Sequence, residues 1–94
     1  MDFLVIAMDG TDDGALDRRM GARDEHIAGI AKLKEQGHFI AGGAILDDKG
    51  KMIGSTVIVD FPDRESVEKC IAEDPYSKAD VWLDVTIQPF RAVR

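Results

Sequence analysis

Two residues of this chain have the types that proton transfer near neutral pH requires: His26, and the Asp74 of an Asp-Pro-Tyr step. A carboxylate that accepts a hydrogen bond from one imidazole nitrogen fixes the tautomer of the ring and leaves the other nitrogen free as a base. Pro75 stiffens the turn that would hold the carboxylate in place. The two residues are far apart along the chain, so they form a catalytic pair only if the fold brings them together.

The position of His26 on an expected helix supports this pairing. Arg23, His26, Ile30 and Leu33 follow at i, i+3, i+7 and i+10, which puts them in one row of the helix. The last two must face the core, so we expect Arg23 and His26 to point toward the same side. A structural interpretation competes, because a lone histidine beside an apolar stripe is commonly a hydrogen-bonded structural residue and an Asp before a Pro commonly starts a turn.

Five further residues are candidates for binding a substrate around that pair. Arg23 has the charge to anchor an anionic or enolate oxygen, or it pairs with an acid on the helix surface. Ser55 follows a glycine in an expected strand and can donate a hydrogen bond to a ligand, or it is a serine that the strand simply tolerates. Tyr76 lines the pocket or packs at the sheet edge. Gly42 and Gly43 leave room for a ligand, or they mark a bulge in their strand.

The other histidine, the acidic clusters and the cysteine do not match the spacing of a metal site or the surroundings of a catalytic nucleophile. His26 and His38 have neither the spacing nor the cysteines of a zinc site, and His38 should be exposed. The acidic pairs at 12–13 and 47–48 do not match a calcium loop. Cys70 lies on an apolar helix stripe without a neighbouring base, so we expect it in the core rather than as a nucleophile. We therefore expect no metal, and no cofactor, since no phosphate loop or dinucleotide motif occurs.

Composition limits the class of protein and its partners. The chain has 94 residues, which we interpret as one domain at 1–94, with 45% hydrophobic and 32% charged residues, as in soluble globular proteins. A net charge of −6 argues against binding to nucleic acid or to an anionic membrane surface. One cysteine excludes an internal disulfide, and the N-terminus has no signal-peptide pattern, so we expect a cytoplasmic protein.

Hydrophobic periodicity and turn residues predict six elements in the order β-α-β-β-α-β. Gly37 is expected to end the first helix and Asp63 to cap the second, and Pro89 indicates that the end of the last strand is an edge or a terminus. This order predicts an α+β ferredoxin-like sandwich, a four-stranded antiparallel sheet with two helices on one face. The expected elements are a strand at 3–8, a helix at 16–36, a strand at 38–46, a hairpin turn at 47–50, a strand at 51–61, a helix at 64–73, a turn at 74–77 and a strand at 81–90.

The same patterns predict which side chains face inward. On the last strand, Trp82 interrupts the polar side. We expect it to face the contact between two copies of the chain, to cap a pocket, or to pack within the fold. The first and third strands carry apolar residues on both faces, although two helices cover only one face. This predicts a homodimer formed through the open face. The residues expected inward are Leu16, Met20, Ile27, Ile30, Ala31 and Leu33 on the long helix and Val81, Leu83, Val85 and Ile87 on the last strand.

An ordered set of short motifs runs along nearly the whole chain: Arg23 and His26, Gly37, Ala41-Gly42-Gly43, Gly54-Ser55, Asp74-Pro75-Tyr76, and Ile87, Pro89 and Phe90. At these spacings the set resembles the YCII-related (YciI-like) family. The resemblance implies a ferredoxin-like fold that dimerises through its sheets, as in the dimeric α/β-barrel superfamily, and an active site at His26 and Asp74. The family includes a dehydrochlorinase that acts on a chlorinated hydroxyquinol. The chain departs from the family pattern at Ala44, where a proline is usual.

Three functions are compatible with these residues. The first is a small cofactor-free enzyme that uses His26 and Asp74 for general acid–base chemistry, an elimination or isomerisation, on a small polar cyclic or aromatic compound. The second is a non-catalytic dimeric module that binds a small molecule in the same pocket. In the third, the pair only fastens the long helix to the turn before the last strand.

Overall fold

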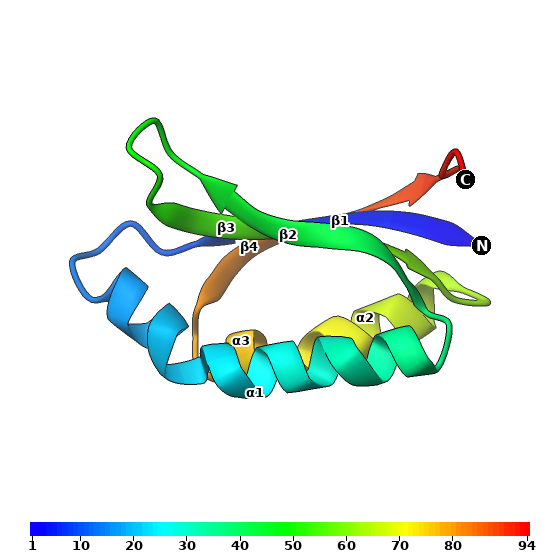
Figure 1. Cartoon of the computed structure of the whole chain (residues 1–94), viewed down its shortest axis with the longest axis horizontal. Coiled ribbons are helices and arrows are strands. Elements are labelled where there is room, and N and C mark those ends of the chain that lie inside the picture. The colour runs from blue at the N-terminus through cyan, green and yellow to red at the C-terminus, as the bar shows by residue number, and fades with distance from the viewer.

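A computed structural model describes residues 1–94 as one four-stranded antiparallel sheet with all its helices on one side (Figure 1). The strand order is β2-β3-β1-β4. The expected β-α-β-β-α-β order and the ferredoxin-like α+β class are confirmed, and one short helix is added. The elements are β1 (Asp2–Asp9), α1 (Ala15–Glu35), β2 (Phe39–Leu46), β3 (Met52–Asp60), α2 (Arg64–Glu73), α3 (Pro75–Lys78) and β4 (Trp82–Phe90).

Local signals in the sequence explain where the elements begin and end. Gly37 follows α1 with a φ of 77°, a left-handed conformation that glycine adopts without strain. The Asp63 side chain accepts a hydrogen bond of 2.8 Å from the backbone N–H of Ser66 and so caps α2. β4 lies at an edge of the sheet and pairs with a strand on one side only, so Pro89, which has no backbone N–H, is tolerated there. These expectations are confirmed.

The short helix α3 corrects the expected turn at 74–77. The Asp74 side chain accepts a hydrogen bond of 2.8 Å from the backbone N–H of Tyr76, and Pro75 occupies the first turn of the helix. Both residues favour a helix start, because an acidic N-cap satisfies a free N–H and proline has none to satisfy. Asp74 therefore ends α2 and begins α3, which fixes its carboxylate between two helices.

The buried row of α1 is shifted from the expected one. Its buried residues are Ala15, Arg19 and Ala22, whereas Met20 is 51% exposed and Ile27 is 48% exposed. The expectation that both would face inward was wrong. A charged residue takes an inward position because it has a buried partner there, the carboxylate of Asp9. Counting only apolar residues therefore placed the row in the wrong phase.

A bulge likewise changes which residues of β4 face the helices. The register shifts between Met8 and Asp9 of β1, so that Asp9 pairs with Trp82 and Met8 pairs with Asp84. Trp82 is consequently 9% exposed, and Leu83 is 64% exposed. The expectation that Leu83 would face inward, with Trp82 on the polar side, was wrong, because a single extra residue reverses the alternation.

Helices cover one face of the sheet and leave the other face open (Figure 1). Phe3, Val5 and Ala7 of β1 are each 1% exposed and pack in clusters that include residues of the helices, such as Ala22 and Val67. Residues between them in sequence point to the other face, where Ile6 is 38% exposed and no helix lies over it (Figure 1). None of the helices combines the length and the apolar composition of a membrane-spanning segment.

Candidate functional site

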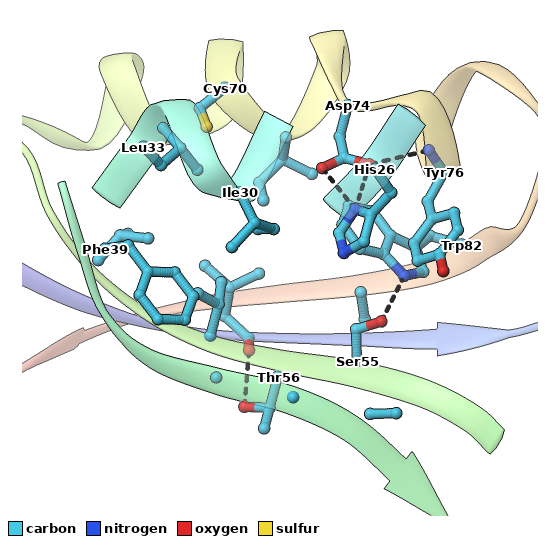
Figure 2. Close-up of a pocket in the computed structure, with 18 of the residues that line it drawn as sticks. His26, Ile30, Leu33, Phe39, Ser55, Thr56, Cys70, Asp74, Tyr76 and Trp82 are labelled. Atoms are coloured by element: carbon cyan, nitrogen blue, oxygen red, sulfur yellow. Dashed lines mark hydrogen bonds and ion pairs between the residues drawn. The ribbon is translucent and has the colours of Figure 1, made fainter. Parts of the chain in front are cut away.

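A cavity of about 260 Å³ lies between the helices and the sheet and is lined mainly by apolar side chains. Its two ends differ in chemistry (Figure 2). A cavity of roughly 150 Å³ already accommodates benzene, so this one is large enough for a substituted ring. We call the residues at one end the polar end: Arg19, His26, Ser55, Asp74, Tyr76 and Trp82. We call those at the other the apolar end: Ile30, Leu33, Phe39 and Cys70.

His26 and Asp74 meet at the polar end. The Nδ1 atom of His26 lies 2.9 Å from Oδ1 and 3.0 Å from Oδ2 of Asp74. Their side chains are 12% and 13% exposed. A carboxylate only accepts hydrogen bonds, so Nδ1 carries the proton of this contact. The Nε2 atom has no partner in the protein, and it faces away from Asp74 in Figure 2.

Aromatic contacts fix the orientation of the imidazole. The ring of His26 stacks on the ring of Tyr76, with centroids 4.0 Å apart and planes inclined by 13°. Trp82 meets the same imidazole edge-on, at 5.7 Å. Tyr76 is 1% exposed, and its burial raises the pKa of its hydroxyl, which the positive charge of Arg19 partly opposes. His26 is therefore held on one ring face and at Nδ1, which restricts its rotation.

Arg19 is the residue of the polar end that the sequence patterns did not single out. Its Nη1 atom donates to both carboxylate oxygens of Asp9 at 3.0 Å, and both side chains are 3% exposed. Its guanidinium carbon lies 4.8 Å from the ring centroid of Tyr76. Arg19 precedes His26 by two helical turns, and that spacing was the available signal. Its Nε atom is buried without a hydrogen-bond partner.

Ser55 receives two hydrogen bonds at the same end of the cavity. Nη2 of Arg19 donates to its Oγ atom at 2.9 Å, and Nε1 of Trp82 donates to it at 3.1 Å. Ser55 is 8% exposed. Trp82 thus packs over the pocket, which is one of the alternatives open from the sequence, and it also orients the serine (Figure 2).

The other expected binding residues contribute less to this end. Arg23 is an exposed residue that lines the cavity and makes no ion pair, so it lies at the rim and not in the inward row. Gly42 and Gly43 also line the cavity. A Cβ atom on Gly42 would come within 2.7 Å of the carbonyl oxygen of Thr56, so close packing of strands explains that glycine. The sequence left open a bulge at these two glycines. The register shifts of β2 lie elsewhere in the strand, so the glycines do not mark a bulge.

The remaining candidates have separate environments. Cys70 is half-buried at the apolar end, and burial raises the pKa of its thiol, which disfavours the nucleophilic thiolate. His38 is half-buried, not exposed as expected, because its Nδ1 atom bonds to the carbonyl oxygen of Asp60 at 2.8 Å and its ring stacks on Phe61. No three His, Cys, Asp or Glu side chains lie together as a metal site.

Comparisons with known proteins agree with this architecture. The chain is 30% identical to the YciI protein of Escherichia coli O6:H1, over 97% of both chains. Its structure is similar to TftG of Burkholderia phenoliruptrix AC1100, a 5-chloro-2-hydroxyhydroquinone dehydrochlorinase in complex with 2,5-dihydroxybenzoquinone. The TM-score is 0.84 at 25% identity, covering 97% of this chain and 94% of that one. A dimeric ferredoxin-like protein from Jannaschia sp. CCS1 shares the fold, with a TM-score of 0.51 at 10% identity, over 97% of this chain and 98% of that one.

The YCII-related domain family matches residues 1–91 of the chain. This match and the E. coli relative confirm the resemblance that the short motifs indicated. The chain belongs to the YCII-related domain family.

Proposed function

We propose that this protein is a small enzyme in which His26, oriented by Asp74, transfers protons to and from a small oxygenated ring compound. The observation that carries the proposal is the contact of Nδ1 with both oxygens of Asp74, at 2.9 and 3.0 Å. This contact leaves Nε2 as the proton acceptor. The cavity of about 260 Å³ beside it has room for one substituted ring.

The reaction we propose is an elimination or an isomerisation. Nε2 of His26 removes a proton from the substrate, and the electron pair that is released expels a leaving group or moves along the ring. The imidazolium then returns its proton to the departing group or to another ring position. The carboxylate of Asp74 stabilises the imidazolium while it exists, so the reaction requires neither metal nor redox cofactor.

We propose that five further residues bind the substrate. Arg23, at the rim, supplies positive charge toward an oxygen that becomes negative in the reaction. Ser55 offers its hydroxyl at the polar end, and Tyr76 forms a wall of the cavity beside His26. Gly42 and Gly43 keep the opposite wall, on β2, free of side chains.

The similarity to TftG supports an elimination in particular. That protein is a dehydrochlorinase, and a dehydrochlorination removes a proton and a chloride from a ring without net oxidation. Its likeness extends over 97% of this chain with a TM-score of 0.84. We therefore take a chlorinated, hydroxylated ring as the first substrate to test.

The test is to incubate the purified protein with 5-chloro-2-hydroxyhydroquinone and measure chloride release. We expect turnover by the unmodified protein and a loss of about 10²–10⁴-fold in the His26→Ala variant, the range that general acid–base catalysis contributes. The matched control is His38→Ala, the same substitution at a histidine outside the cavity, which should stay active. A fully active His26→Ala variant would contradict the proposal.

The alternative function is a non-catalytic dimeric module that holds a small molecule. It predicts that hydroxylated ring compounds are retained by the protein and recovered unchanged. Mass spectrometry of the compound after incubation detects an elimination, which changes its mass, and chromatography or its absorption spectrum detects an isomerisation, which does not.

We also propose that two copies associate through the open face of the sheet. Ile6 is 38% exposed on that face, and its neighbours Leu4 and Ile58 are half-buried without a covering helix. An apolar sheet face of this kind favours a partner, and a second copy is the simplest one. Sedimentation should give the mass of a dimer, and Ile6→Lys should shift it toward the monomer. A monomer at high concentration would contradict this proposal.

A further inference from the structure

The hydroxyl of Ser55 lies between two groups that can only donate hydrogen bonds. An arginine guanidinium and a tryptophan indole have N–H donors and no acceptor. Nη2 of Arg19 lies 2.9 Å from Oγ, and Nε1 of Trp82 lies 3.1 Å from it. Both contacts therefore run in one direction, with Ser55 as the acceptor in each.

This arrangement determines where the Ser55 proton can go. A serine hydroxyl has two lone pairs and one O–H. The two N–H groups occupy both lone pairs, so the O–H must be donated to a third group. No backbone or side-chain acceptor of the protein makes a hydrogen bond with it. Ser55 lines the cavity, at the end where His26 also lies.

The two donors are themselves fixed. Arg19 cannot rotate away without leaving the carboxylate of Asp9, and its guanidinium also lies against the ring of Tyr76. Arginine stays charged at all physiological pH values, so its N–H groups never become acceptors. Trp82 is 9% exposed and packed in the core beside Ala7 and Val81. Neither neighbour can release Ser55 from its role.

We infer that Arg19 and Trp82 hold Ser55 as a permanent hydrogen-bond donor toward the cavity, so that the ligand presents a carbonyl or an ionised oxygen to it. The inference rests on the proposed function, since it concerns a ligand in the same cavity. Arg19 and Trp82 act as positioning residues for Ser55, because the N–H groups that they direct at its Oγ atom are occupied there. A ligand group that can only donate is disfavoured at this position, because two donors then face each other.

The pairing of Arg19 with Asp9 makes this role of Ser55 specific. The guanidinium and the carboxylate are both 3% exposed and in contact at 3.0 Å, so they largely neutralise each other beside the cavity. The directed O–H of Ser55 therefore gives a negative oxygen at this end a specific contact, in addition to the charge that Arg23 supplies at the rim. The ring of the ligand would extend from this point toward Ile30 and Phe39 of the apolar end.

The test uses 4-nitrophenol as a probe, because its ionised form absorbs visible light and its neutral form does not. The unmodified protein should bind the ionised form more tightly and so lower the pKa of the bound probe. In Ser55→Ala, affinity for the ionised form should fall by about tenfold or more, the effect of losing a hydrogen bond to a charged group. The pKa of the bound probe should then rise.

The matched control is Ser77→Ala. Its hydroxyl also makes a hydrogen bond, to the carbonyl oxygen of Ile71 at 2.6 Å, but Ser77 does not line the cavity. This variant should bind the probe as the unmodified protein does. The Trp82→Phe variant keeps the ring packing and removes one N–H, so the Ser55 hydroxyl gains freedom. It should raise the pKa of the bound probe by less than Ser55→Ala does.

Three outcomes would overturn the inference. The unmodified protein has no preference for the ionised form, Ser55→Ala keeps the full preference, or Trp82→Phe leaves the pKa of the bound probe unchanged. Thermal unfolding of each variant shows whether it is folded. If Ser55→Ala does not fold, the Trp82→Phe variant tests the inference in its place. The probe measures binding without turnover, so the result is independent of the His26 chemistry. If His26→Ala remains active but Ser55→Ala loses the preference, the proposed reaction fails and the inference about Ser55 stands.

Discussion

The two ends of the cavity are built on different principles. At the polar end, Arg19 and Trp82 donate to Ser55 at 2.9 and 3.1 Å, and a separate contact of 2.9 Å joins His26 to Asp74. Each of these hydrogen bonds has a defined direction, and Asp9 holds Arg19 from outside the cavity at 3.0 Å. At the apolar end, side chains such as Leu33 and Phe39 line the cavity through non-directional contacts. Under the proposed function, the polar end determines which atoms react and the apolar end determines which rings fit. Substitutions at the two ends should therefore affect different measured quantities.

The largest effect should come from Asp74→Asn. The amide keeps the size of the side chain and can still cap α3, so the free energy of unfolding should change little. It no longer enforces the Nδ1–H tautomer or stabilises the imidazolium, so kcat/KM should fall by about 10²–10⁴-fold. Steady-state kinetics and urea denaturation on the same preparation measure both. A variant that loses stability but keeps its kcat/KM would assign the pair a structural role.

The next effect, on stability, should come from Arg19→Met. This change leaves the carboxylate of Asp9 buried without its partner, at 3% exposure, which should lower the free energy of unfolding by about 3–5 kcal/mol. The matched control is Arg18→Met, one position earlier on α1, where the guanidinium pairs with the exposed Asp12. The control should unfold close to the unmodified protein, because exposed pairs contribute little. Equal losses in the two variants would contradict the distinct role of the buried pair.

A smaller effect is expected at the apolar end, from Leu33→Ala. Leu33 is half-buried, so the free energy of unfolding should fall by about 1–2 kcal/mol, less than for a fully buried leucine. The KM of a substrate with an apolar ring substituent should rise by about tenfold, whereas kcat should stay nearly unchanged. Kinetics with a pair of substrates, with and without that substituent, check this. A loss in kcat alone would show that the two ends are not separable.

The smallest effect concerns pH and the exposed pair near the start of α1. The guanidinium of Arg18 holds the pKa of the Asp12 carboxyl well below its ordinary value of 3.8. A carboxyl whose pKa is lowered by folding stabilises the fold above that ordinary value, and the stabilisation is lost as the pH falls through the lowered pKa. Asp12→Asn should therefore melt slightly below the unmodified protein at neutral pH, and the difference should vanish in strong acid. A difference that grows in acid would contradict the assignment.

Much of the fold follows from local patterns in the sequence. Gly37 and Asp63 mark helix ends, and Pro89 marks an edge strand, because each acts through its own backbone. The contact of His26 with Asp74 was anticipated from the row on α1 together with the family motifs. Sequence spacing alone favoured a structural role for the pair, and the structure shows their contact at 2.9 Å.

The parts that were missed depend on contacts between distant segments. Arg19 looks like a surface residue in sequence, and only the register of β1 brings Asp9 to it. Trp82 was assigned to the polar side because strict alternation was assumed, and a bulge against Asp9 reversed it. The donor role of Ser55 follows from both, so the sequence could suggest that it binds a ligand but not in which direction its proton points.

Chemical rescue of His26→Ala tests the central claim most directly. The account predicts that added imidazole restores part of the chloride release from 5-chloro-2-hydroxyhydroquinone, because a free imidazole can enter the vacated space and accept the proton. The restored rate should follow the pKa of the imidazole derivative used, as general base catalysis requires. The contradicting result is a folded His26→Ala variant that either keeps the full rate or gains none from any imidazole.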